Sequence, residues 1–298
     1  KLYFAPWKPT FRFDFRPLKD MFGFGSKLIL TNIFTQISNN IFSVVLGKFY
    51  NPSQVGFYTQ GQKWMGMGHQ LIGGMINGVA QPVLVEVMDD KERQALVFRK
   101  MVRFGAFISF PAMLGLAFVA KEFVWILLGE KWLDSVPFLQ LFCIWGAIEY
   151  LRLLYTNLLV SHGKSDIYLY GMVLIGLLQL LIVGVMFPFG IYSMVIGYVC
   201  TYYIGLLYWH CFVKNILSIN VFDIIIDILP YIGAIFVSFF IANLLILHIE
   251  NLYISFLLKF VISAIVYCLI MWYGDSIIFK EVLSYFKNGL NRILTYNR

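Results

Sequence analysis

The stretch that decides the fold runs from residue 51 to residue 132. It opens as NPSQVGFYTQGQKW (residues 51–64), continues through an apolar run with sparse polar residues to QPVLVEVMDDKERQ (residues 81–94), and ends in VAKEFVWILLGEKW (residues 119–132). One charged elbow therefore joins two long apolar segments, and a short polar turn follows the second. This is the pattern of two membrane helices connected at one face of a bilayer.

The composition of the whole chain supports the same class. Hydrophobic residues make up 60% of the chain and charged residues only 13%, whereas soluble domains carry about a quarter charged residues. Aromatic residues, at 18%, are typical of helices that end at lipid–water interfaces. The net charge of +7 is then better explained by Lys and Arg on one side of a membrane than by nucleic-acid binding.

We expect an all-α, polytopic integral membrane protein. Turn signals separate eight apolar segments, at about 21–48, 57–87, 98–120, 136–160, 167–187, 192–213, 222–247 and 252–273. Four regions follow: an interfacial or cytoplasmic segment (1–20), a bundle of about six transmembrane helices (21–213), two additional helices (214–274) and a cytoplasmic amphipathic tail (275–298).

The distribution of basic residues predicts the orientation. Most of the 23 Lys and Arg residues fall on the side that holds the first residues, the elbow at 89–93 and the tail. By the positive-inside rule, both ends of this chain are cytoplasmic. The chain starts at Lys1 with no Met and no signal peptide, so we expect these first residues to be an internal loop of a longer protein.

A polar stripe follows the second apolar segment. Its members are Lys63, Gln70, Asn77 and Gln81, which lie within about 40° of one another at 100° per residue. The first segment repeats the pattern with Asn32, Gln36 and Asn39. Such faces look toward a water-filled cavity or toward another helix. The sequence leaves open whether these amides line a substrate cavity or only join helices.

Four charged residues inside the spans are further candidates. Lys63 has no acidic residue at i±3 or i±4, and it could bind an anionic group or extend toward the interface. Glu149 and Arg152 are three residues apart, so they could pair with each other or serve the cavity. Lys259 is a candidate for contact with a lipid tail or head group. The four cysteines and four histidines show no metal spacing, and we expect no metal site and no catalytic residue.

Four segments resemble a known family. They are FGFGSKLILTNIFTQISNNIFSVVLGKFYNPSQVGFYTQGQKW (22–64), QPVLVEVMDDKERQ (81–94), FPAMLGLAFVAKEFVWILLGEKW (110–132) and LLVSHGKSD (158–166). In their residues, their order and their spacing, these segments are similar to the C-terminal part of the Wzx-type lipopolysaccharide or O-antigen flippases, especially the WzxC-like branch. These belong to the multidrug/oligosaccharidyl-lipid/polysaccharide superfamily. The resemblance covers about half of the chain; from residue 167 onward only hydropathy matches.

The resemblance implies a fold and a function. The eight spans would be the last eight of a two-bundle protein, namely one MATE-like six-helix bundle and two extra C-terminal helices, and they would hold one wall of a cavity between the bundles. Such proteins move undecaprenyl-diphosphate-linked oligosaccharides across the bacterial inner membrane by alternating access. The expected partners are the bilayer, the lipid-linked glycan, and polysaccharide polymerases and glycosyltransferases. No cofactor is expected, although an H⁺ or Na⁺ gradient could drive transport.

The sequence also bears on two other function classes. A MATE-type exporter of drugs or other small molecules would need acidic residues in its spans to bind cations, whereas these spans hold few acids, chiefly Glu149. A membrane-bound polysaccharide polymerase or acyltransferase would need reactive residues at an interface. His162 and Asp166 lie in one turn, but there is no nucleophile motif and no Gly-rich phosphate loop beside them.

Overall fold

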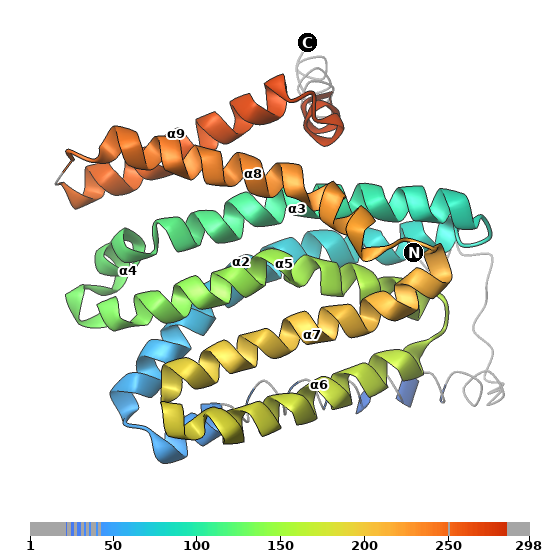
Figure 1. Ribbon diagram of the computed structural model, residues 1–298, viewed down its shortest axis with the longest axis horizontal. Coiled ribbons are helices and arrows are strands. Elements are labelled where there is room, and N and C mark those ends of the chain that lie inside the picture. Colours follow the sequence, from blue (N-terminus) through green and yellow to red (C-terminus); the bar gives the residue numbers. More distant parts are fainter. Residues whose placement is uncertain are drawn as a thin grey trace, which may run out of the picture.

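The computed structural model describes residues 22, 25–26, 29–30, 33, 36, 40, 43–249 and 251–284. Within these ranges the structure is helical and contains no strand. Long helices lie side by side along the longest dimension of the molecule (Figure 1). Their bounds are α2 Pro52–Glu86, α3 Lys91–Phe118, α4 Ala120–Leu128, η2 Glu130–Ser135, α5 Val136–Ser161, α6 Ser165–Met186, η3 Phe187–Phe189, α7 Ile191–Leu217, α8 Val221–Ile246 and α9 Leu252–Tyr273.

The polar residues of the connections fix where helices begin. Asn51 accepts a hydrogen bond from the backbone N–H of Gln54 at 2.9 Å, and Pro52 occupies the first turn of α2. Asp90 likewise accepts from the N–H of Arg93 at 3.0 Å and caps α3. Side-chain oxygens at these positions satisfy amides that the helix itself leaves free. The polar elbow of the sequence is therefore the connection between the end of α2 and the beginning of α3.

Six helices in the described ranges are long and apolar enough to cross a membrane, by length and composition: α3, α5 with η2, α6 with η3, α7, α8 and α9. Each coincides with one of the expected segments. The expected second segment corresponds to α2, a 35-residue helix. Helix α2 is not among these six, because its polar stripe and its glycines make it less apolar than they are. The expected first segment lies mostly outside the described residues.

Helix α5 is the centre of the bundle, because it packs against α2, α3, α6 and α7. Close approach to α2 depends on Gly61, where a Cβ would lie 2.8 Å from the backbone nitrogen of Leu139. On the other side Gly105 of α3 makes room for the ring of Tyr150, which is fully buried. Small residues that let helix backbones approach are typical of membrane bundles.

Two of the segments that carry the family resemblance meet at one end of the bundle. The Gln94 side chain is buried and donates to the Leu84 carbonyl at 2.9 Å, across the elbow between α2 and α3. Its Oε1 lies 3.1 Å from Nε2 of His162, in the turn between α5 and α6. Burial and the neighbouring Lys164 lower the pKa of His162. These polar residues hold two turns together, so the structure gives them a role in folding.

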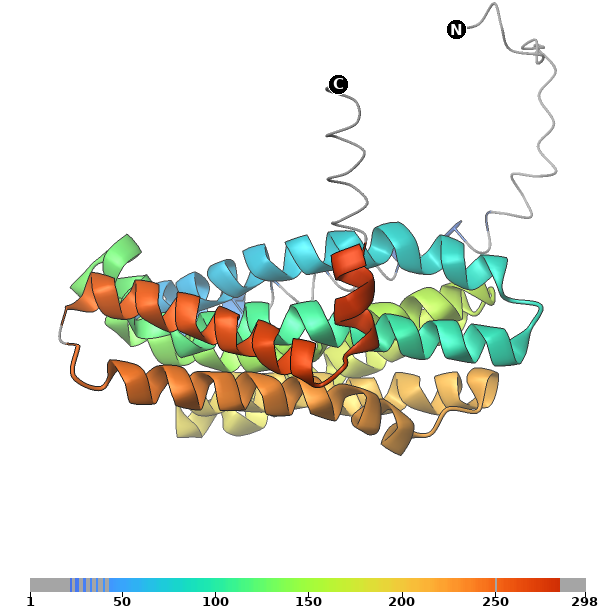
Figure 2. The same ribbon diagram turned by 90° about the horizontal axis from the view of Figure 1, so that it is seen from above.

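The connections alternate between the two ends of the bundle. The elbow between α2 and α3, the α5–α6 turn and the α7–α8 turn lie at one end, and the α6–α7 and α8–α9 turns lie at the other (Figure 1). Helices α8 and α9 form a pair that packs on α3 and α4. Residues 277–284 are helical and turn away from the direction of α9 (Figure 2).

Candidate functional site

The polar stripe of α2 lies on the exposed side of the helix. Lys63, Gln70, Asn77 and Gln81 are all exposed. The opposite side of α2 packs into the core and is buried; its residues include Tyr58, Met65, Ile72, Ile76 and Ala80. The stripe is therefore a line of exposed polar residues on a helix that is packed against the membrane-spanning bundle, and exposed apolar residues such as Leu71 and Met75 lie beside it. A polar surface of this kind requires water, a polar ligand or another polar helix beside it.

Lys63 is the charged member of the stripe. Within the described part of the chain, no carboxylate lies within ion-pair distance of its ammonium group, and the Trp64 ring centroid lies 6.0 Å away. Each of the acids Glu122, Glu149 and Asp227, which lie within helices, already pairs with another cation. Among the described residues, Lys63 is therefore a cation without a carboxylate partner.

The amides of the stripe differ in their contacts. Asn77 accepts a hydrogen bond from Nδ2 of Asn157 at 2.8 Å, which joins α2 to α5, whereas no hydrogen bond of Gln70 or Gln81 occurs among the described contacts. Asn77 thus acts, at least in part, as a link between helices. Of the candidates in the first segment, Gln36 is exposed, and Asn32 and Asn39 lie outside the described residues.

Glu149 and Arg152 form a buried ion pair within α5. Their side chains are only 4% and 16% exposed. The pair borders a cavity of about 150 Å³, which His69 of α2, Gln179 of α6 and Tyr202 of α7 also line. A buried charge is tolerated in such surroundings only when it is paired and hydrogen-bonded. We call this space the polar cavity.

Two ion pairs between helices were not anticipated from the sequence. Arg99 of α3 donates two hydrogen bonds to Asp227 of α8, at 2.7 and 3.1 Å. Lys259 of α9 lies 2.6 Å from Oε1 of Glu122 in α4. The only sequence signal was an acid inside each apolar run, as in VFDIIIDILP. Lys259, a candidate for lipid contact, thus holds α9 against α4.

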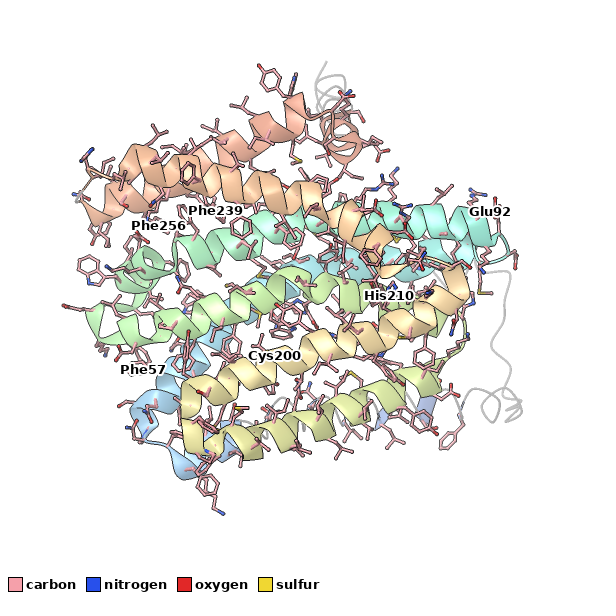
Figure 3. The ribbon with its side chains drawn as sticks, viewed as in Figure 1. Phe57, Glu92, Cys200, His210, Phe239 and Phe256 are labelled. Atoms are coloured by element: carbon pink, nitrogen blue, oxygen red, sulfur yellow. The ribbon has the colours of Figure 1, made fainter. Side chains whose placement is uncertain are left out.

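A largely apolar groove of about 630 Å³ lies between α3, α8 and α9. Its lining includes Phe107, Pro111 and Tyr267, with Phe239 of α8 and Phe256 of α9 among the side chains on its walls (Figure 3). Phe123 and Phe260, the neighbours of the Lys259–Glu122 pair in sequence, also line it. The groove has the chemistry of a site for a hydrocarbon chain.

The described residues offer few other groups of metal-binding or reactive side chains. Among the residues that the structure describes, no group of three or more His, Cys, Asp or Glu could hold a metal ion. The His162 ring, a candidate in the enzyme hypothesis, hydrogen-bonds Gln94. The arrangement offers binding surfaces, namely a polar face, a polar cavity and an apolar groove.

Comparison with known proteins agrees with this description. A family profile described as "Polysaccharide biosynthesis protein" matches residues 1–137. An uncharacterized membrane protein in the cps region of Klebsiella pneumoniae is 29% identical over 97% of this chain and 60% of its own length. The lipopolysaccharide biosynthesis protein WzxC of Escherichia coli is 27% identical over 54% of this chain and 33% of its own. The chain is thus similar to proteins of polysaccharide biosynthesis, WzxC among them.

Comparison with a solved structure identifies the fold. The lipid II flippase MurJ, in an inward closed conformation, superposes with a TM-score of 0.66 over 94% of this chain and 58% of MurJ, at 15% identity. The teichuronic acid biosynthesis protein TuaB of Bacillus subtilis is 28% identical over 57% of this chain and 35% of its own length. The chain thus spans between a third and three fifths of the length of these relatives. It is an all-α, multi-pass membrane protein, as expected.

Proposed function

We propose that this protein is a flippase that moves an undecaprenyl-diphosphate-linked glycan across the bacterial inner membrane by alternating access. The observation that carries the proposal is the exposed polar stripe of α2 on a bundle with the MurJ fold. Amide side chains can hydrogen-bond sugar hydroxyls without charge. Lys63, without a carboxylate partner in the described part, supplies a positive charge for the diphosphate.

The other two surfaces have roles in the same proposal. The apolar groove of α3, α8 and α9 would hold the hydrocarbon tail while the head group follows the stripe. The polar cavity around Glu149 and Arg152 is where an H⁺ or Na⁺ gradient would act on the bundle, because it combines titratable groups from three helices, α2, α5 and α7. Glycosyltransferases and a polymerase would supply and consume the glycan. No catalytic role is assigned to any residue.

The orientation belongs to the proposal as well. The end that carries Lys91, Arg93, Lys164 and Lys214 would face the cytoplasm, in accordance with the positive-inside rule. Lys48, Lys121 and Lys131 would lie at the opposite end. The first and last residues of this chain would then both be cytoplasmic.

An exporter of cationic drugs is the alternative, and the pairing of charges argues against it. Such a cargo needs a carboxylate that is free to bind it. In the described spans Glu149 and Asp227 each pair with arginine, and Glu122 pairs with Lys259. The remaining charge of the stripe is positive, which favours an anionic cargo.

The experiment is the export of lipid-linked glycan by cells that carry Lys63→Ala in this gene. We expect surface glycan to fall severalfold while the amount of protein in the membrane stays unchanged. Lys131→Ala is the matched control, because Lys131 is also exposed, is also followed by Trp, and lies 5.8 Å from that ring but outside the stripe. Equal export by the two variants would remove Lys63 from the transport path.

A further inference from the structure

A cluster of charges lies where α3, α8 and the residues after α9 meet. Arg99 binds Asp227 through two hydrogen bonds, Lys100 lies 2.8 Å from Glu281, and Lys280 pairs with Asp275. These three pairs match each carboxylate with a cation. Arg103 is a second cation beside Asp227: its Nε lies 3.9 Å from Oδ1 of that carboxylate, within ion-pair distance, but is buried and has no hydrogen-bond partner within the described residues.

Arg103 lines a cavity of about 380 Å³. Tyr231 of α8 and Ser276 contribute hydroxyl groups to the lining, and Asp227 and Asp275 contribute carboxylates that Arg99 and Lys280 already neutralise. The rest of the lining is mostly apolar and includes Ile226 and Ile277. Asp227 thus has two arginines beside it, so these charged residues carry one positive charge more than their carboxylates balance. A guanidinium group beside hydroxyl groups is the chemistry that binds phosphate.

The cavity lies at the depth of a membrane interface. Helix α9 has 22 residues, which is about 33 Å at 1.5 Å per residue and close to the ~30 Å of a bilayer core. Gly274 to Ile278, immediately after α9, form one side of the cavity. The helix at 277–284 turns away from α9 at this point (Figure 2), as a helix lying along an interface would.

The surface next to the cavity is suited to acyl chains. Ile226 is 63% exposed and Ile277 62% exposed at its rim, and Leu229 continues the exposed apolar surface along α8. A soluble phosphate would gain nothing from this surface. We propose that the cavity binds the phosphate of an anionic phospholipid, with Arg103 as the principal contact and the lipid tails against α8.

The test measures lipid bound to the purified full chain in a neutral detergent, by mass spectrometry of the intact complex. The probes are phosphatidylglycerol, phosphatidylcholine and soluble glycerol phosphate. We expect phosphatidylglycerol to bind about tenfold more tightly than phosphatidylcholine, and Arg103→Gln to remove about that factor, as befits one charge-assisted contact. Arg93→Gln is the matched control, because Arg93 lies on the same helix but is exposed beside the elbow; we expect it to change binding less than about twofold.

A second variant covers the case in which Arg103→Gln does not fold. Ile277→Glu changes an exposed residue in the first turn of the helix at 277–284, where an acidic side chain suits the helix dipole. It places a negative charge at the rim and should weaken phosphatidylglycerol binding severalfold. Unchanged binding in the folded variants would overturn the proposal. So would equal binding of the two lipids, or full displacement by millimolar glycerol phosphate, which would indicate a soluble anion as the ligand.

Discussion

The buried pair of Glu149 and Arg152 gives the sharpest prediction about what holds the bundle together. Arg152→Leu removes the cation and leaves a carboxylate that is 4% exposed. Breaking a buried ion pair in this way costs about 3–5 kcal/mol. We expect the lower end of that range, because the polar cavity of about 150 Å³ next to the pair has room for water.

The double variant Glu149→Leu/Arg152→Leu should behave differently. It replaces both charges with apolar groups, and such replacements are often neutral or stabilising. At about 2 °C per kcal/mol for a chain of this size, the single variant should lower the unfolding midpoint by roughly 6 °C, and the double variant should recover most of that loss.

The assay is thermal unfolding of the purified protein in detergent, followed by circular dichroism at one fixed scan rate. Arg93→Leu, at an exposed position of α3, controls for the loss of a positive charge without burial. If the single and double variants lowered the midpoint equally, the pair would not stabilise the bundle electrostatically and the reasoning would be refuted. A double variant that folds but does not transport would link the polar cavity to coupling.

Three further predictions follow from packing, from pairing and from exposure. Gly105→Ala should destabilise the protein by about 1–3 kcal/mol, seen as a lower unfolding midpoint, because its Cβ would overlap the ring of Tyr150. Asp227→Asn should lower the midpoint by several degrees, since it weakens the bidentate contact with Arg99. In a variant without native cysteines, Gln70→Cys should react quickly with a membrane-impermeant thiol reagent, because its side chain is exposed on the stripe.

Each of these predictions has a control within the chain. Gly115→Ala lies on the same helix as Gly105 but has nothing within 4 Å of the added Cβ, so it should be tolerated. Asp89→Asn changes an exposed acid in the elbow and should leave the midpoint unchanged. Ile72→Cys, two residues from Gln70 but buried, should react slowly. Equal behaviour of a variant and its control would contradict the contact or the exposure in question.

The sequence predicted the helices well because lipid imposes simple rules. A span must be apolar and about 20 residues long, so the expected segment at 252–273 coincides with α9. Local pairs are also predictable, since residues three apart share a helix face. The Glu149–Arg152 pair, one of the two alternatives considered, is an example.

Contacts between distant segments could not be read from the sequence in the same way. Arg99 and Asp227 are 128 residues apart, and Lys259 and Glu122 are 137 residues apart. Hydropathy counts such residues as charges near a helix end and says nothing about which helices are neighbours. Hence the sequence suggests Lys259 as a contact for lipid, and only the packing of α3 against α8 shows that Arg103 is a second arginine beside Asp227.

The most direct test of the central claim is flipping of a fluorescent undecaprenyl-diphosphate oligosaccharide in proteoliposomes that contain the complete product of this gene. A membrane-impermeant reagent that destroys the fluorophore reports the fraction on the outer leaflet over time. We expect rapid loss of the protected fraction with the wild-type protein and a severalfold slower loss with Lys63→Ala. A wild-type rate equal to that of protein-free liposomes would contradict the central claim.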